Sequence, residues 1–354
     1  MRKITLLQIL FLFSFSILAQ IPSGYYDTAV GKTDNTLRTT LASIINSTSF
    51  NVTSYSGLYV AYNKTDINPT TGKIWDMYSN CNFTYGSDEN HGTNGSECTN
   101  YNREHTSPQS WFGEASPMVS DLFNVYPTDT KVNGMRSNYP YGEVSTASYI
   151  SGNGSKLGSS SMSEYSGVVF EPINEFKGDL ARTCLYMATC YASVCQNWGS
   201  GATVVYGSNN GLSTYSVALF LKWHRQDPVS TKELNRNNAV YGIQRNRNPF
   251  IDYPAMAEHI WGNKKGTPWS FTSGIDNLKV EFSVSQLSGS KSIQIQTNEQ
   301  NFNYRVLSLN GIMVDKNNSA NSNEIQTRQL NEGMYIVEVQ SGNRKSNKKI
   351  VITN

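Results

Sequence analysis

The sequence predicts an α+β domain followed by a small all-β module, and three observations carry this expectation. Residues 22 to about 266 mix short extended runs with amphipathic helical segments. Beyond Val280, apolar and polar residues alternate in runs such as SIQIQT, YRVLSL and MYIVEVQ, as in strands with one buried face. Turn-rich sequence separates the two regions. We therefore expect a domain at 20–266, a linker at 267–279 and a sandwich-like module at 280–354.

The first residues are typical of a secretory signal peptide, which we expect to cover residues 1–19. Arg2 and Lys3 precede an apolar run from Ile4 to Ala19, and two positive charges before a short apolar core are typical of export signals. The run is shorter than the roughly 20 apolar residues of a spanning helix. A buried N-terminal helix is the alternative. We expect cleavage after Ala19, no membrane span, and a protein that is secreted or held at the cell surface.

The mature chain is expected to carry no net charge. Without Arg2 and Lys3 the 29 Lys and Arg residues become 27, which equals the 27 Asp and Glu residues. Such a chain has no global basic field to draw it to nucleic acid, so attraction of a polyanion must be local. No heptads and no apolar dimer stripe are present, so we expect a monomer.

The early part of the larger domain predicts strands and loops. The runs YVAY at 59–62 and GKIWDM at 72–77 favour strands, with turn signals at Pro69 and Gly72 between them. Residues 82–102 are rich in Gly, Ser, Asn and Asp, which favours a loop.

The later part of this domain predicts helices, because apolar residues recur there at helical spacing. Ser230 and Glu233 form a capping-box pattern, and Pro254 suits the first turn of a last short helix. Arg182, on an apolar helix, is expected to form a buried structural pair. The expected helices cover residues 177–195, 212–225, 231–244 and 254–262.

Five cysteines are present, and an exported chain can form disulfides. A bridge between Cys81 and Cys98 would stiffen the loop before the candidate site. Cys190 and Cys195 are spaced poorly for a bridge within one helix, and an odd count leaves at least one thiol free. The pairing stays open, and the absence of a CxxC pair argues against a zinc site.

Chemistry-bearing side chains gather in one stretch of the chain. The segment NREHTSPQSWF places Glu104 beside His105, and DLFNVYPTDTKVNGMRSNYPYGEV places Asn133 and Arg136 on a short expected helix. Carboxylate and amide oxygens suit a hard cation such as Mg²⁺, an imidazole can take a proton from water, and a guanidinium can bind phosphate. Together these groups suit one-metal hydrolysis of a phosphodiester.

The Glu-His pair raises a geometric question. Adjacent residues of a regular strand point to opposite faces, so Glu104 and His105 must lie on an irregular strand or at its end. Pro108 favours an early end of the strand. Taken alone, such a dipeptide is more often an exposed pair than a site. The other histidines are expected in loop or helix-end roles: His91, His224 and His259.

These motifs, with FKGDLARTCLYM, LKWHRQDPVS and GIQRNRNPFIDYP, resemble the bacterial endonuclease I family of secreted or periplasmic nucleases, from about Tyr25 to Trp261. The resemblance implies a ββα-metal (His-Me finger) fold. It also implies hydrolysis of DNA, and often RNA, with little sequence preference and 5′-phosphate products. By matching positions, His105 resembles the general base, and Glu104 and Asn133 resemble the Mg²⁺ ligands. Mn²⁺ or Ca²⁺ are alternative ions.

Two positions depart from the family pattern. The short connection after the Glu-His pair carries no Arg, so the transition-state Arg of the periplasmic members has no counterpart there. Arg136, Arg245 and Arg247 are candidates by chemistry, and Arg136 is the one that we expect at the site. Asn124 stands where many shorter relatives carry His.

The last residues, LNEGMYIVEVQSGNRKSNKKIVITN, resemble the sorting domain of proteins exported by the type IX secretion system of Bacteroidetes. This resemblance implies recognition by that secretion machinery. The module from residue 280 contains no His, Cys or Trp, so we assign no catalysis to it.

The sequence favours a secreted, metal-dependent endonuclease whose substrate is DNA, RNA or both. A secreted binding or adhesion protein would also fit the neutral charge and the β tail, but it predicts no divalent-dependent turnover. A phosphoesterase for small esters is a second alternative. Neither explains Glu104, His105 and Asn133 together with the long family-like motifs.

Overall fold

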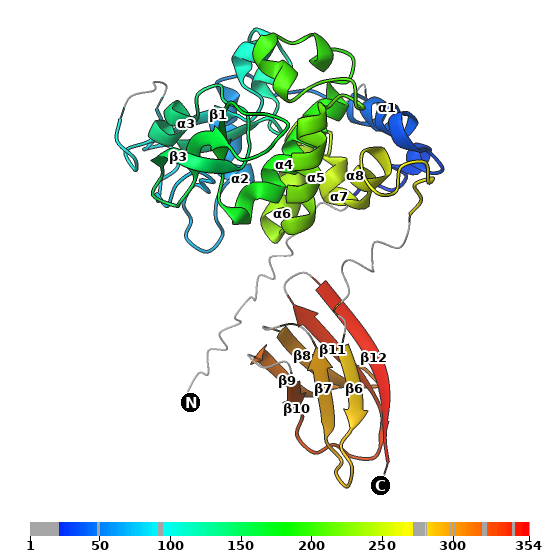
Figure 1. The fold of residues 1–354 in the computed structure, drawn as a ribbon. Coiled ribbons are helices and arrows are strands. Elements are labelled where there is room, and N and C mark those ends of the chain that lie inside the picture. Colours follow the sequence, from blue (N-terminus) through cyan, green and yellow to red (C-terminus); the bar gives the residue numbers. More distant parts are fainter. Residues whose placement is uncertain are drawn as a thin grey trace, which may run out of the picture. The chain divides into compact units, whose positions relative to one another are not determined.

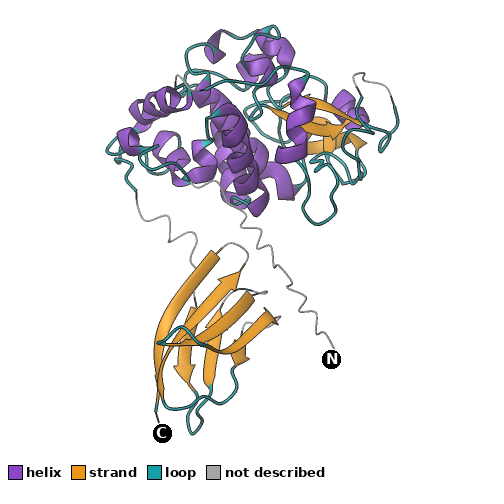
Figure 2. Cartoon of the chain, turned by 180° about the vertical axis from the view of Figure 1, so that it is seen from behind, coloured by secondary structure: helices purple, strands orange, loops and turns teal. Residues whose placement is uncertain are grey.

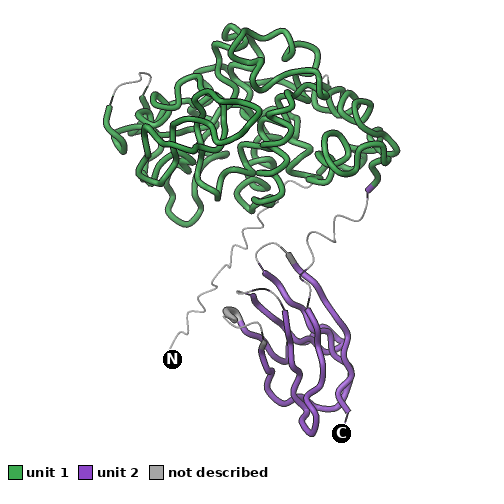
Figure 3. The backbone as a smooth tube through the Cα atoms, in the orientation of Figure 1, with its two compact units in different colours: residues 1–270 green, residues 271–354 purple. Residues whose placement is uncertain are grey.

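The computed structural model describes residues 21–353 apart from 48–49, 91–94, 272–279, 281, 298, 300–301, 321–323 and 342–343. The chain divides into two compact units, residues 1–270 and 271–354 (Figure 3). The expected signal peptide lies outside the described residues. Within the described ranges, no helix has the length and apolar character needed to cross a membrane.

Helices dominate the first unit (Figures 1 and 2). The central one is α4, buried from Phe176 to Cys190, and it contacts both α1 and α5. Short 3₁₀ turns lie at 27–29, 109–112, 118–120, 195–197 and 200–204. The helices are α1 (Asp34–Ile45), α2 (Gly57–Thr65), α3 (Thr130–Arg136), α4 (Asn174–Cys190), α5 (Thr214–Gln226), α6 (Thr231–Gln244), α7 (Pro249–Asp252) and α8 (Ala255–Ile260).

Two small antiparallel sheets complete the described part of the first unit. In one, β1 (Tyr101–His105) pairs with β2 (Val125–Asp129), and α3 follows β2 directly and contacts both strands. In the other, the order is β3 (Val144–Ile150), β4 (Lys156–Ser160), β5 (Val168–Glu171). The mixture of helices and sheets agrees with the predicted α+β class.

The later helices follow the sequence pattern. The predicted capping box is present at α6: Ser230 Oγ accepts a hydrogen bond from Glu233 N, and Glu233 Oε2 accepts one from Ser230 N. Pro254 directly precedes α8. Helix α4 ends at Cys190, earlier than the predicted residue 195, because the chain turns at 191–194.

The two predicted early strands are wrong. Residues 59–62 lie within α2, and residues 72–77 form irregular structure with one isolated bridge, between Ile67 and Ile74. Leu58 and Tyr62 are four residues apart and both buried, on a helix that contacts α6 and β2. A short apolar run fits either period, so the packing of this face decided the outcome.

The described residues of the second unit form two antiparallel sheets around one apolar core, as the alternating pattern predicts. One sheet has the order β10-β7-β6 and the other β12-β11-β8-β9 (Figure 1). The strands are β6 (Phe282–Gln286), β7 (Ile293–Thr297), β8 (Phe302–Ser308), β9 (Met313–Ala320), β10 (Glu324–Gln326), β11 (Gly333–Ser341) and β12 (Arg344–Ile352).

Candidate active site

Strand β1 ends at the Glu-His pair. Glu104 and His105 occupy its last two positions, opposite Tyr126 and Val125 of β2. The chain then leaves the sheet, and Pro108 precedes the 3₁₀ turn at 109–112. The expectation that the strand ends at this pair is confirmed. The regular alternation of side chains between the two faces of the sheet therefore stops at His105.

Glu104 is a buried carboxylate, with 2% of its surface exposed. Its Oε1 accepts hydrogen bonds from the Tyr78 hydroxyl at 2.9 Å and from Arg136 Nη1 at 2.7 Å. The Tyr78 hydroxyl also lies 2.5 Å from that of Tyr141. Burial raises the pKa of Glu104 to about 7, against the opposing effect of Arg136. These contacts use Oε1 and hold the orientation of the carboxylate.

Arg136, at the end of α3, does not face solvent. Only 1% of its surface is exposed. Besides Glu104, its guanidinium donates to the His105 carbonyl through Nη1 and to the Thr106 carbonyl through Nη2, each at 2.7 Å. We predicted that Arg136 contacts a phosphate directly, and its burial corrects this prediction. Helix α3 packs against β1, so the Arg136 guanidinium forms its hydrogen bonds inside the unit. Arg136 holds the end of the strand and the carboxylate in place.

His105 is nearly as buried, with 6% of its surface exposed. Its Nε2 lies 3.0 Å from the Val119 carbonyl oxygen. Because a carbonyl only accepts, Nε2 carries the ring proton and Nδ1 keeps a free lone pair. Burial lowers the pKa of His105 to about 4, and the charges of Arg103 and Arg136 act in the same direction. The ring is therefore neutral at pH 7, with Nδ1 able to accept a proton.

Asn133 lies one turn before Arg136 on α3 and also turns toward β1. Its Nδ2 donates to Asn102 Oδ1 at 2.7 Å and to the Arg103 carbonyl at 3.4 Å. Both bonds use the amide nitrogen, which leaves Oδ1 as the oxygen available to another group. The structure thus brings the Asn133 side chain on α3 to the strand that carries Glu104.

The side-chain donors near β1 and α3 limit which cation could bind there. No group of three or more His, Cys, Asp and Glu side chains suited to a metal occurs in the described part of the chain. A fully protein-ligated site of the zinc type therefore does not fit these residues. One carboxylate and one amide oxygen do fit Mg²⁺, which uses few protein oxygens and keeps several waters.

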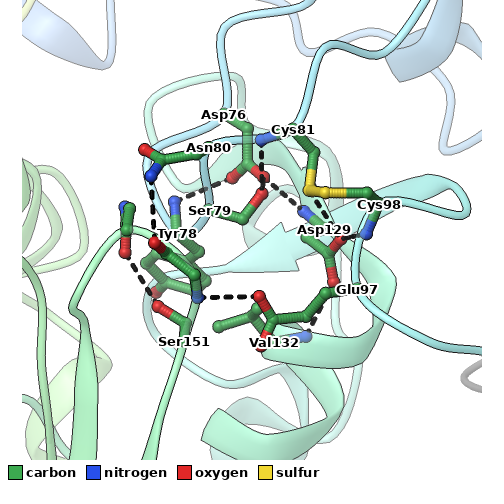
Figure 4. The surroundings of a disulfide bond; sticks show 12 residues. Asp76, Tyr78, Ser79, Asn80, Cys81, Glu97, Cys98, Asp129, Val132 and Ser151 are labelled. Atoms are coloured by element: carbon green, nitrogen blue, oxygen red, sulfur yellow. Dashed lines mark hydrogen bonds between the residues drawn. A yellow bond between two sulfur atoms is a disulfide. The ribbon is translucent and has the colours of Figure 1, made fainter.

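A disulfide between Cys81 and Cys98 closes the loop that precedes β1, and this loop contacts the residue that caps α3 (Figure 4). Asp129 joins them: its Oδ2 accepts from Cys98 N at 2.7 Å, and its Oδ1 caps α3 by accepting from Val132 N at 2.9 Å. Its own N–H donates to Asp76 Oδ2 at 3.1 Å. The remaining cysteines, Cys184, Cys190 and Cys195, are buried free thiols. The sequence had left this pairing open.

Asn124 forms hydrogen bonds with the residues that follow His105. Its Oδ1 accepts from Thr106 Oγ1 at 2.8 Å and from Ser107 N at 2.9 Å, and its Nδ2 donates to the Met118 carbonyl at 3.1 Å. The side chain is fully buried. Asn124 therefore braces the turn that directly follows His105.

The other arginines that the sequence analysis considered lie in different environments from that of Arg136. Arg247 forms a buried pair with Asp252 at 2.7 Å, which is a structural role. Arg245 is an exposed residue at the end of α6. Arg182 pairs with Glu233 at 2.5 Å inside the unit, as predicted.

The predicted helix-end roles of two histidines agree with the structure. His224 Nε2 lies 3.0 Å from the Pro254 carbonyl oxygen, and His259 Nδ1 lies 2.8 Å from that of Thr267. His91 lies outside the described residues.

Sequence reasoning missed most of the groups that hold the site together. Tyr78 and Tyr141 are far from the Glu-His pair in sequence, and no local pattern marks them. Asp129 was detectable, because Asp directly before a helix favours an N-cap. Arg103 was also detectable, because it lies two residues before His105 on the same strand and so on the same face.

Two family models match this chain. Residues 33–255 match the model of the Endonuclease I family, and residues 289–353 match that of the secretion system C-terminal sorting domain. The protein is therefore an enzyme of the nuclease class with a type IX sorting tail. The chain belongs to the endonuclease I family, as its motifs predicted.

Several curated proteins are similar to part of this chain. The chain is 32% identical over 246 residues to an extracellular ribonuclease of Bacillus amyloliquefaciens, covering 67% of this chain and 78% of the relative. It is 30% identical over 249 residues to the extracellular ribonuclease of Bacillus subtilis (strain 168), with the same coverage. An extracellular deoxyribonuclease of Aeromonas hydrophila is 27% identical over 139 residues, covering 39% of this chain and 52% of the relative.

The sorting tail and these extracellular relatives indicate a secreted or cell-surface protein, as predicted. Membership of a nuclease family also argues against the alternative of a binding or adhesion protein without turnover.

Proposed function

We propose that this protein is a metal-dependent endonuclease that hydrolyses phosphodiester bonds of DNA, RNA or both. It has little sequence preference, leaves 5′-phosphates and acts as a monomer. The observation that carries the proposal is the bond from His105 Nε2 to the Val119 carbonyl. This bond fixes a neutral imidazole whose Nδ1 can remove a proton from water.

His105 acts as the general base. Its lowered pKa keeps the lone pair on Nδ1 free at neutral pH. A base with a pKa of about 4 is weak, so its effect depends on position rather than basicity. The bond to Val119 supplies that position, because it fixes the ring plane.

Glu104 on β1 and Asn133 on α3 would hold a Mg²⁺ ion, with Mn²⁺ or Ca²⁺ as alternatives. When bound, this cation would neutralise charge on the phosphoryl group and on the leaving 3′-oxygen. Tyr78 and Arg136 donate to Oε1 of Glu104, so we assign the ion to Oε2. Burial raises the pKa of Glu104 to about 7. A cation bound at Oε2 would favour the ionised form of this carboxylate.

Arg136 acts through other groups rather than on the substrate. It orients Glu104 and draws the His105 and Thr106 carbonyls toward α3. One buried guanidinium thus keeps the carboxylate and the base in fixed relation.

The substrate class follows from the family and the relatives. The relatives are named ribonuclease and deoxyribonuclease, so we propose DNA, RNA or both as the substrate of this enzyme. Such an enzyme contacts mainly the phosphate backbone, which carries no sequence information. The second unit serves export through the type IX machinery.

The test is cleavage of supercoiled plasmid and of total RNA by the purified full chain, with Mg²⁺ and with EDTA. We expect Mg²⁺-dependent smearing of at least one polymer, and its loss in His105→Ala. His259→Gln serves as the matched control, because it alters another buried histidine that is hydrogen-bonded to a carbonyl. Full activity of His105→Ala would overturn the assigned base, and a folded protein that cleaves neither polymer would overturn the function. Cleavage of a chromogenic phosphodiester alone would favour the small-ester alternative.

A further inference from the structure

Arg103 is a cation that lies beside the candidate base on β1. It lies two residues before His105 on β1, and so on the same face of the strand. Among the residues that the structure describes, no carboxylate forms an ion pair with it. Other arginines of this unit are paired with Asp or Glu: Arg136, Arg182, Arg225, Arg236 and Arg247.

Two tyrosines fix the position of the Arg103 guanidinium. Its Cζ lies 3.7 Å from the centroid of the Tyr55 ring and 4.7 Å from that of Tyr59. Its Nη1 also donates to the Tyr55 carbonyl at 2.9 Å. A cation held over aromatic faces in this way is attracted by the ring quadrupoles and loses little further freedom on binding.

The same tyrosine connects Arg103 to the base. The Tyr55 ring stacks near His105, with centroids 6.0 Å apart and planes inclined by 28°. Tyr55 is 38% exposed and Arg103 is partly exposed. Arg103, Tyr55 and His105 therefore form one contiguous group that reaches the surface.

The guanidinium still has binding capacity. Of its five N–H donors, the described residues engage one, through the bond to the Tyr55 carbonyl. A planar fork of free N–H groups matches the oxygens of a phosphate. In a mature chain with equal numbers of acidic and basic residues, one uncompensated cation at the site provides the local attraction that a polyanion requires.

We propose that Arg103, held in place by Tyr55, binds a backbone phosphate of the nucleic acid beside His105. This inference rests on the proposed function, because it assigns a substrate contact to the same site. Arg103 is then a substrate-binding residue, and Tyr55 is a positioning residue that acts through it.

The test is binding of a fluorescein-labelled single-stranded oligonucleotide to the full chain in EDTA, over a range of salt concentrations. We expect Arg103→Gln to weaken binding about tenfold or more at low salt, and to reduce the slope of log Kd against log salt by about one. Arg103→Lys keeps the charge, so it should restore the slope while binding less tightly than the wild type, because it lacks the fork.

Tyr55 is tested in the same assay. Tyr55→Ala should weaken binding through loss of the held geometry, and Tyr55→Phe should bind like the wild type because the ring remains. Lys64→Gln removes an exposed cation of α2, and Tyr139→Ala removes a tyrosine that is 41% exposed. Neither control should change the affinity or the slope.

The outcomes distinguish a failure of the Arg103 subsite proposal from a failure of the proposed nuclease function. An Arg103→Gln protein with wild-type affinity and slope would overturn the subsite, as would an equal loss in Lys64→Gln. If the wild type still cleaves in Mg²⁺, the proposed function stands in either case. A wild-type chain that neither binds nor cleaves would overturn both. Circular dichroism melting of each variant identifies any that fail to fold, and Arg103→Lys then carries the test.

Discussion

Arg136 on α3 donates a 2.7 Å hydrogen bond from Nη1 to Oε1 of Glu104 on β1, and both side chains are almost fully buried. The pair joins the strand that carries His105, the proposed base, to the helix that carries Asn133. Breaking it would leave an uncompensated charge and two carbonyls without their donor. The relation between these two residues therefore determines both the stability and the geometry of the site.

We predict that Arg136→Ala lowers the free energy of unfolding by about 3–5 kcal/mol, as for other broken buried pairs, and abolishes cleavage. Urea denaturation and plasmid cleavage measure the two effects. Arg225→Ala is the matched control, because it breaks the pair with Glu258 in which the Arg225 side chain is 44% exposed, and should cost about 0–1 kcal/mol. Equal losses in the two variants would contradict this account.

We predict that the disulfide supports activity through α3. Reduction, or the double change Cys81→Ser and Cys98→Ser, frees the loop whose Cys98 N–H is bonded to the helix-capping Asp129. A closed loop of this length stabilises by about 3 kcal/mol in the chain-entropy account. We expect that loss in urea denaturation, together with slower cleavage. The control is dithiothreitol added to the double variant, which should have no further effect. Undiminished cleavage by the stably folded double variant would disprove the link to α3.

A third prediction concerns stability at acidic pH. Burial, with the nearby charge of Arg182, lowers the pKa of His224 from 6.5 to about 4. The unfolded chain therefore takes up this proton first as pH falls, so the free energy of unfolding falls between pH 6.5 and about 4. For one site the loss is on the order of 3 kcal/mol.

Denaturation over this pH range tests that prediction in the wild type and in His224→Gln. Glutamine keeps an N–H for the Pro254 carbonyl but does not titrate, so the variant should show a shallower dependence. His105 titrates in the same direction and is unchanged in both proteins. Identical pH slopes for the two proteins would rule out a contribution from His224.

The last prediction separates the cation ligands from the base. We expect Asn133→Ala to raise the Mg²⁺ concentration needed for half-maximal cleavage, because it removes one of the two protein oxygens proposed to hold the cation. His105→Ala should lower the rate at every Mg²⁺ concentration. Titration of Mg²⁺ into each variant measures the difference, with Asn102→Ala as a control for the hydrogen bond between the two amides. An unchanged Mg²⁺ requirement in Asn133→Ala would remove this residue from the proposed set.

Local sequence signals predicted several features well. Helical spacing located α4 and α5, and the Ser230 capping box located the start of α6. Each of these features depends on residues within a few positions of one another. The predicted strand at 59–62 failed because a four-residue apolar run is too short to define a period, and burial of one face against α6 and β2 selected the helix.

By itself, the sequence determined the family and the sorting tail, because both reside in contiguous motifs. From such motifs it also predicted Glu104, His105 and Asn133 as site residues. Only the tertiary structure decided how those side chains are held. The tautomer of His105 depends on the carbonyl of Val119, and the orientation of Glu104 depends on Tyr78. Burial of Arg136, which removed it from phosphate binding, depends on the packing of α3 against β1. Hydrogen bonds and packing contacts between residues that are distant in sequence leave no local sequence pattern. Such contacts can therefore be identified only from the folded structure.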